Sequence, residues 1–135
     1  MAHALRADHD LRRVIDDGRE VAGLDEADLL DLYRQLVLLR TYDERSVVYH
    51  RQGRIGTYAI FWGHEAMQVG SAYALDDDDW IFPSYRESAI GLLRGMPVAT
   101  ILLWWRGHPS GWWSPADSNV ASFCVPIGTQ IEATL

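Results

Sequence analysis

Residues 80–87 read WIFPSYRE, and this short segment combines the pattern of a strand with the start of a helix. The apolar run Trp80–Pro83 follows four aspartates and is bounded by turn residues, which is typical of a buried strand. Ser84 and Glu87 have the S-x-x-E spacing of a capping box. We therefore expect a helix from Tyr85 to about residue 94, and a strand that leads into a helix indicates α/β architecture.

The segments on either side extend this α/β pattern. Asp25 precedes an apolar stripe with helical spacing, which predicts a long helix over about residues 26–52 that Gly53 ends. The members of this stripe are Leu29, Leu32, Tyr33, Leu36, Val37 and Leu39. Small residues predict a closely packed helix over residues 64–75, and Pro97 begins another that reaches about residue 106. Residues 107–119 are expected to form a loop and residues 120–127 a second strand. Residues 1–24 are charged and poor in large apolar side chains, so we expect a mobile N-terminal arm.

Composition excludes several classes of protein. The chain has 135 residues and 19 acidic against 12 basic side chains, and its net charge of −7 disfavours binding to nucleic acid or to an anionic membrane. A lone cysteine, Cys124, excludes an intrachain disulfide and a cysteine-based zinc site. The longest apolar run is far below the roughly 20 residues that cross a bilayer, and no signal peptide is evident. We expect a cytoplasmic protein.

The first candidate site is the junction that contains Tyr85 and Arg86. Ligands of open α/β sheets bind beyond the carboxyl ends of the strands. The N-terminus of the expected helix would offer free N–H groups, and the guanidinium of Arg86 would add a fork for phosphate oxygens. The alternative is that Arg86 pairs with a carboxylate and Tyr85 packs in the core.

Other motifs are weaker. The segment VPIGTQ at residues 125–130 ends a predicted strand, and its carbonyls could bind a ligand N–H or a monovalent cation, or it could be an ordinary turn. The run Asp76–Asp79 lacks the interleaved spacing of a calcium loop and is better explained as a solvated turn. His64-Glu65 has no second histidine for a zinc motif, and no glycine-rich nucleotide motif is present.

Five segments in this order resemble the α subunit of thiamine-diphosphate-dependent 2-oxo acid dehydrogenases. They are residues 32–40 (LYRQLVLLR), 63–66 (GHEA), 69–70 (VG), 79–87 (DWIFPSYRE) and 126–130 (PIGTQ). The resemblance covers Leu24 to about Gln130, and it corresponds to about the N-terminal third of a full-length α subunit. It implies that residues 25–135 form part of a thiamine-diphosphate-binding fold, an incomplete parallel sheet with flanking helices.

The resemblance also implies a reaction and partners. The family carries out the oxidative decarboxylation of a small 2-oxo acid and transfers the acyl group to a lipoyl group. The α subunit holds the diphosphate half of thiamine diphosphate, and a β subunit holds the pyrimidine half. We therefore expect the β subunit and the lipoyl acyltransferase core as partners, in a heterotetramer-based dehydrogenase.

The resemblance also implies roles for individual residues, and for Tyr85 and Arg86 it agrees with the argument from the expected helix N-terminus. Tyr85 and Arg86 correspond to diphosphate contacts, and Val125 and Ile127 to residues near the aminopyrimidine. A potassium site of branched-chain members corresponds to Cys124, Pro126, Thr129 and Gln130, with Cys124 in place of a family serine. Tyr58 is a candidate for the substrate side of the pocket, and packing against Trp62 or Phe61 is its alternative.

The family's G-D-G motif and downstream asparagine, which bind magnesium, have no counterpart in the 135 residues. We therefore expect the chain alone to be inactive, since the diphosphate charge would not be neutralised. A second hypothesis is a non-catalytic interaction module that docks a β-like subunit through the long helix and a surface of four tryptophans, Trp104, Trp105, Trp112 and Trp113. A third is an unrelated α/β protein that binds a phosphorylated metabolite at Tyr85 and Arg86.

Overall fold

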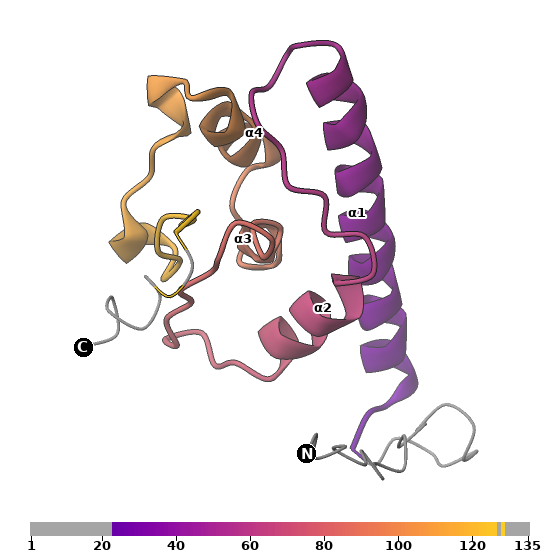
Figure 1. Cartoon of the computed structure of the whole chain (residues 1–135). Coiled ribbons are helices and arrows are strands. Elements are labelled where there is room, and N and C mark those ends of the chain that lie inside the picture. The colour runs from indigo at the N-terminus through magenta and orange to yellow at the C-terminus, as the bar shows by residue number, and fades with distance from the viewer. Residues whose placement is uncertain (1–22, 127, 129–135) are drawn as a thin grey trace, which may run out of the picture.

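A computed structural model describes residues 23–126 and 128 of the chain. Helix α1 (Glu26–Arg51) forms one side of the molecule, and the rest of the described chain folds against it (Figure 1). The remaining elements are α2 (Glu65–Tyr73), α3 (Ile90–Leu93), α4 (Val98–Arg106) and two single 3-10 turns, η1 (Pro109–Gly111) and η2 (Pro115–Asp117). Of the arm expected at residues 1–24, all but the last two residues lie outside the described part.

The bounds of α1 confirm the prediction from its caps. Asp25 accepts a hydrogen bond from the Asp28 amide at 2.8 Å, and Asp28 accepts one from the Asp25 amide at 3.1 Å, which makes a reciprocal capping box. At the other end, Gln52 caps the helix, and Gly53 follows with a φ of +67°. The left-handed conformation is accessible to glycine at little cost, so the chain can turn back there.

The buried face of α1 differs from the predicted apolar stripe. Leu39 is buried as expected for such a stripe, and Tyr42, Asp43 and Ser46 are buried with it. The expected stripe is partly open instead, because three of its members are 46–63% exposed: Leu29, Tyr33 and Val37. The buried residues of α1 therefore lie in its second half, whereas in its first half Leu32 and Leu36 are only partly buried against the core.

Aromatic side chains fill the space between α4 and the segment that follows it. The Trp104 ring meets Trp105 at 5.0 Å and Phe123 at 5.1 Å between centroids, and Trp113 meets Phe123 at 4.9 Å. The Trp113 indole also donates to the Val120 carbonyl at 2.8 Å. Of the four tryptophans in the docking hypothesis, Trp112 is 69% exposed, Trp105 is buried, and Trp104 and Trp113 are half-buried against the core. Docking through this surface stays a prediction.

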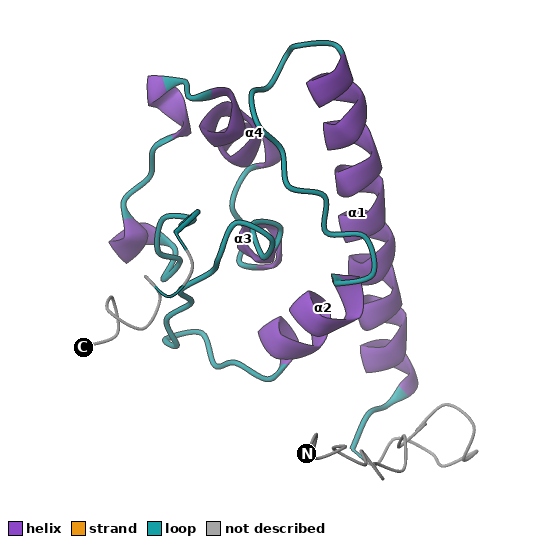
Figure 2. Ribbon diagram, in the orientation of Figure 1, coloured by secondary structure: helices purple, strands orange, loops and turns teal. Residues whose placement is uncertain are grey.

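The two predicted strands are not formed within residues 23–126 and 128, where Figure 2 shows helices and loops only. Two isolated parallel bridges stand in their place, Ile81 with Val120 and Ser84 with Cys124. The first bridge rests on two bonds of 2.8 Å, from the Ile81 amide to the Asn119 carbonyl and from the Ala121 amide to the Ile81 carbonyl. Pro83 has no N–H to donate the next hydrogen bond of that ladder. The two segments therefore run parallel to each other without forming a sheet.

The helix expected to begin at Tyr85 is also corrected: α3 begins at Ile90. The Glu87 carboxylate does accept from the Ser84 amide at 3.1 Å, as in a capping box. The Ser84 hydroxyl, however, accepts from the Arg86 amide at 3.4 Å and donates to the Glu87 carboxylate. Because the Ser84 backbone is also bridged to Cys124, residues 84–87 form a bend instead of a helical turn.

Within the described residues, none of the helices combines the length and the apolar character that crossing a bilayer requires.

Candidate functional site

The parallel bridges bring two predicted motifs to one edge of the molecule. Since Ser84 and Cys124 are bridged in parallel, the residues that follow each of them leave in the same direction. Tyr85 and Arg86 therefore lie at the same end as Val125, which is 62% exposed. This is the position at which ligands of α/β proteins gather, beyond the carboxyl ends of parallel segments. Ile127, Thr129 and Gln130, also predicted for this edge, lie outside the described residues.

Arg86 is exposed, and its guanidinium is held in place by neutral groups. Its Nη1 donates to the Ile60 carbonyl at 2.6 Å, and its central carbon lies 5.6 Å from the centre of the Tyr85 ring. Among the described residues, no carboxylate pairs with it, so the ion pair considered as an alternative is not formed there. The positive charge is therefore open to an anionic ligand.

The backbone beside Arg86 is fixed from α2. Gln68 is fully buried, and its side-chain amide donates to the Arg86 carbonyl at 3.3 Å. The bond to the Glu87 carboxylate holds Ser84 on the other side of the bend. Tertiary contacts thus position Tyr85 and Arg86, and the helix N-terminus expected to bind phosphate is not among the contributors.

Tyr58, the candidate substrate residue, lies in the core. Its hydroxyl donates to Asp43 Oδ1 at 2.8 Å, and its ring makes edge contacts with Trp105 at 5.2 Å and with Tyr42 at 6.4 Å. Burial raises the pKa of the Tyr58 hydroxyl well above its ordinary value, and the nearby Tyr42 and Asp43 raise it further. The hydroxyl is therefore a protonated donor to Asp43. A contact of Tyr58 with substrate stays a prediction.

The metal predictions meet few suitable groups in the described residues. No set of three histidine, cysteine, aspartate or glutamate side chains gathers there. Of the residues predicted for potassium, Cys124 is half-buried and Pro126 is exposed, and the other two lie outside the described residues. In the aspartate run, Arg94 donates to the Asp76 and Asp79 carbonyls at 2.8 and 2.9 Å, which supports the explanation as a turn.

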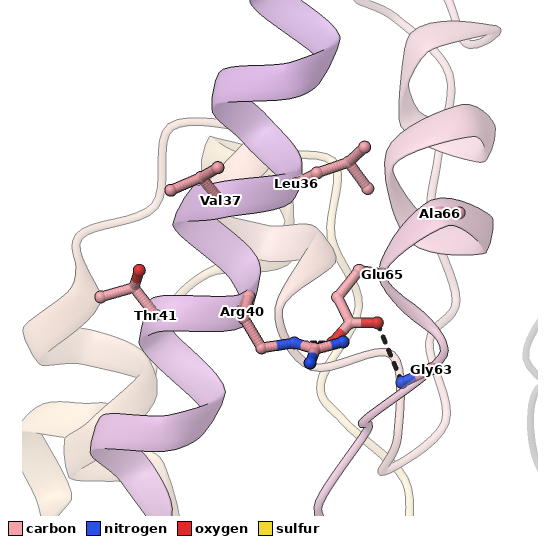
Figure 3. Close-up of a pocket in the computed structure, with 7 residues that line it drawn as sticks. All are labelled: Leu36, Val37, Arg40, Thr41, Gly63, Glu65 and Ala66. Atoms are coloured by element: carbon pink, nitrogen blue, oxygen red, sulfur yellow. Dashed lines mark hydrogen bonds and ion pairs between the residues drawn. The ribbon is translucent and has the colours of Figure 1, made fainter.

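A hollow of about 340 Å³ lies between α1 and α2, and none of the predicted site residues lines it (Figure 3). One wall is an ion pair, in which Arg40 Nε lies 2.7 Å from Glu65 Oε1 while Glu65 Oε2 accepts from the Gly63 amide at 2.9 Å. Burial acts to raise the pKa of Glu65, but the hydrogen bond and positive charge of Arg40, together with backbone hydrogen bonds from Glu65 and Gly63, outweigh it and the pKa is lowered. This ion pair fastens α1 to the beginning of α2.

Sequence reasoning did not identify Asp43. It is 2% exposed, and its Oδ1 accepts from the Tyr58 hydroxyl and, at 3.3 Å, from the Phe61 amide. The signal was available, because Asp43 follows Leu39 by four residues and so shares the buried face of α1. A carboxylate on an apolar helix face is rarely buried unless other groups donate hydrogen bonds to it.

Comparison with known proteins identifies the family. The family model described as dehydrogenase E1 component matches residues 33–122. The chain is 38% identical over 114 residues to the pyruvate dehydrogenase E1 component subunit alpha of Staphylococcus epidermidis RP62A and to that of Staphylococcus aureus MRSA252, matches that cover 84% of this chain. It spans 31% of the length of each of these curated relatives. The chain belongs to the dehydrogenase E1 component family.

Proposed function

We propose that this chain forms the diphosphate-binding side of a thiamine-diphosphate-dependent 2-oxo acid dehydrogenase, as part of its α subunit. The observation that carries the proposal is the parallel bridge between Ser84 and Cys124, which puts Tyr85, Arg86 and Val125 at one edge. Tyr85 and Arg86 belong to one segment of the family resemblance, Val125 directly precedes another, and family membership makes thiamine diphosphate the cofactor to test first.

The residues at this edge fit an anionic group. Arg86 supplies an exposed cation with no carboxylate partner in the described part of the chain, and Tyr85 supplies a ring beneath the guanidinium. A guanidinium can donate two parallel hydrogen bonds to phosphate oxygens. Bound thiamine diphosphate would supply the nucleophilic carbon for decarboxylation, while these residues would bind and orient its diphosphate.

The metals implied by the resemblance fit less well. Magnesium needs hard oxygen ligands, and no suitable cluster of carboxylates is found within residues 23–126 and 128. Its ligands would therefore come from other parts of the enzyme. Potassium would rely on carbonyl and hydroxyl oxygens near Cys124 and Pro126, and we retain this site as a prediction without deriving a role for it.

The partners and the substrate follow from the same proposal. A β subunit would complete the cofactor site, and a lipoyl acyltransferase core would accept the acyl group. The relatives at 38% identity are named as pyruvate dehydrogenase subunits, so pyruvate is the 2-oxo acid to test first. Branched-chain 2-oxo acids are the comparison substrates.

Calorimetric titration tests the proposal. The chain is titrated with thiamine diphosphate and magnesium, with and without a candidate β subunit, as wild type, Arg86→Ala and Arg106→Ala. Arg106 is exposed at the end of α4 and serves as the matched control for lost surface charge. We expect Arg86→Ala to weaken binding by about tenfold or more and Arg106→Ala to leave it unchanged, because a charge-assisted bond to phosphate contributes roughly 1.5–3 kcal/mol. Equal affinities of the two variants would refute the assignment.

A second candidate function is docking of a β-like subunit without catalysis. The exposed apolar side chains of α1 favour it, since Leu29, Leu30, Tyr33, Val37 and Leu38 are each 44–63% exposed. Such side chains on one helix are typical of a protein interface. The same titration distinguishes the two candidate functions. Docking alone is favoured if the β subunit binds the chain with the same affinity whether or not thiamine diphosphate is added, and if the complex binds no thiamine diphosphate.

A further inference from the structure

One peptide group links a buried carboxylate to the exposed cation of the candidate site. The connection between α1 and α2 runs back along α1 (Figure 1). Within it, the Phe61 amide donates to Asp43 Oδ1 at 3.3 Å, and the Ile60 carbonyl accepts from Arg86 Nη1 at 2.6 Å. The N–H of Phe61 and the C=O of Ile60 belong to the same peptide group. Asp43 and Arg86 therefore hold that group from its two sides.

The planarity of the peptide makes this arrangement directional. In a trans peptide, the N–H and C=O bonds point in opposite directions within one plane, so fixing the N–H also aims the carbonyl. The N–H end faces an anion and the carbonyl end faces a cation, and both ends are stabilised by the charge they meet. A negative charge at Asp43 polarises the peptide and strengthens the acceptor that Arg86 uses.

We propose that Asp43 is a positioning residue for Arg86, acting through the single peptide group between Ile60 and Phe61. The inference rests on the proposed function in one respect, namely that Arg86 meets the diphosphate. Asp43 would set the rotamer of Arg86 before the cofactor arrives, which lowers the entropy lost on binding. Asp43 touches neither cofactor nor substrate in this scheme.

Tyr58 separates this role from an ordinary core contact. Its hydroxyl uses the same Asp43 oxygen as the Phe61 amide, so Asp43 has one bond that aims the carbonyl and one that only anchors a ring. Tyr58→Phe removes the second bond and leaves the first. Asp43→Asn keeps an oxygen at the site but removes the charge, and Asp43→Ala removes the oxygen as well. The three variants thus grade the loss of the proposed interaction.

The first experiment measures the position of Arg86 without any cofactor. Phenylglyoxal modifies exposed guanidinium groups, and mass spectrometry of peptides gives the rate at Arg86 separately from the other arginines. We expect the rate in Asp43→Ala to rise by about threefold to tenfold, the range that one lost hydrogen bond supports, with a smaller rise in Asp43→Asn and none in Tyr58→Phe. Equal Arg86 rates in Asp43→Asn and Tyr58→Phe would overturn the inference.

Arg94 reports on unfolding in the same experiment, because its side chain is 11% exposed and is bonded to the Asp76–Asp79 turn. If Asp43→Ala unfolds, the Arg94 rate rises with that of Arg86. In that case, the inference is decided by comparing the Arg86 modification rates of Asp43→Asn and Tyr58→Phe, without the Asp43→Ala rate.

The second experiment is a double-mutant cycle on thiamine diphosphate affinity, with magnesium and a candidate β subunit present. We expect Asp43→Asn to weaken binding about fivefold when Arg86 is present and less than about twofold in the Arg86→Ala background, since coupled residues are not additive. Full additivity would overturn the inference. If Arg86→Ala leaves the affinity unchanged, the proposed function fails, while the phenylglyoxal rates still decide whether Asp43 positions Arg86.

Discussion

Gly111→Ala is the sharpest test of how the segment after α4 packs. Gly111 is buried at the end of η1, which folds back onto α4. A Cβ at this position would lie 2.2 Å from the Trp104 nitrogen and 2.4 Å from the Leu103 carbonyl carbon. Both atoms belong to the backbone of α4, so no side-chain rotation relieves the clash.

The size of the effect follows from these distances. Ordinary van der Waals contact begins at 3.4 Å, so η1 must move away from α4 by about 1.2 Å. Overpacking of this kind costs about 1–3 kcal/mol, and more where the backbone cannot yield. For a chain of this size we expect the midpoint of thermal unfolding to fall by about 3–12 °C.

Gly70→Ala is the matched control for Gly111→Ala. Gly70 is exposed within α2, and a Cβ there would meet nothing within 4 Å. We expect this variant to be more stable than wild type by about 0.5–1 kcal/mol, because alanine restricts the unfolded chain and favours a helix. Urea unfolding followed by tryptophan fluorescence measures both variants. If Gly111→Ala is as stable as Gly70→Ala, the close packing of η1 on α4 is refuted.

Three further predictions concern α1 and its contacts. Leu39→Ala should cost about 2–5 kcal/mol of unfolding free energy because Leu39 is fully buried, while Leu30→Ala, at a 48% exposed position, should change it by less than about 0.5 kcal/mol in urea titrations. Asp25→Ala should cost about 1 kcal/mol by loss of the capping box, measured in the same way, and an unchanged midpoint would contradict it. The lowered pKa of Glu65 gives stability that is present above the ordinary value of 4.5 and is lost as pH falls through the folded pKa. Glu65→Gln should therefore flatten the acid limb of stability against pH, and an unchanged limb would contradict the role of the ion pair.

Local signals in the sequence predict α1 and α4 well. The ends of α1 are set by Asp25 and Gly53, which act on their own neighbours, and α4 lies between Pro97 and Gly107, which has a φ of +71°. Capping and left-handed turns depend on residues close in sequence, so a single chain is enough to read them.

Contacts between distant residues explain what sequence reasoning missed. Ser84 and Glu87 have the spacing of a capping box, but the bridge from Ser84 to Cys124 holds the backbone out of a helical turn. The predicted strands need neighbouring strands to form a ladder, and only two bridges are present in the described residues. The role of Asp43 also depends on distant contacts, since the connection that returns along α1 buries its carboxylate and brings the Phe61 amide to it.

No helix carries Tyr85 and Arg86. The affinity of the candidate site for a ligand therefore depends on the tertiary contacts that hold these residues in place. Arg86 is positioned by Ile60, by Gln68 and by the bend that is bridged to Cys124, each from a different part of the chain. Cofactor that binds only the folded arrangement must stabilise it, and a variant that loosens the arrangement weakens binding by the factor by which it lowers the population of the binding-competent arrangement. Packing of η1 on α4 supports Trp104 against Phe123, the residue before Cys124. Gly111→Ala should therefore reduce thiamine diphosphate affinity although it lies outside the site, and Gly70→Ala should not.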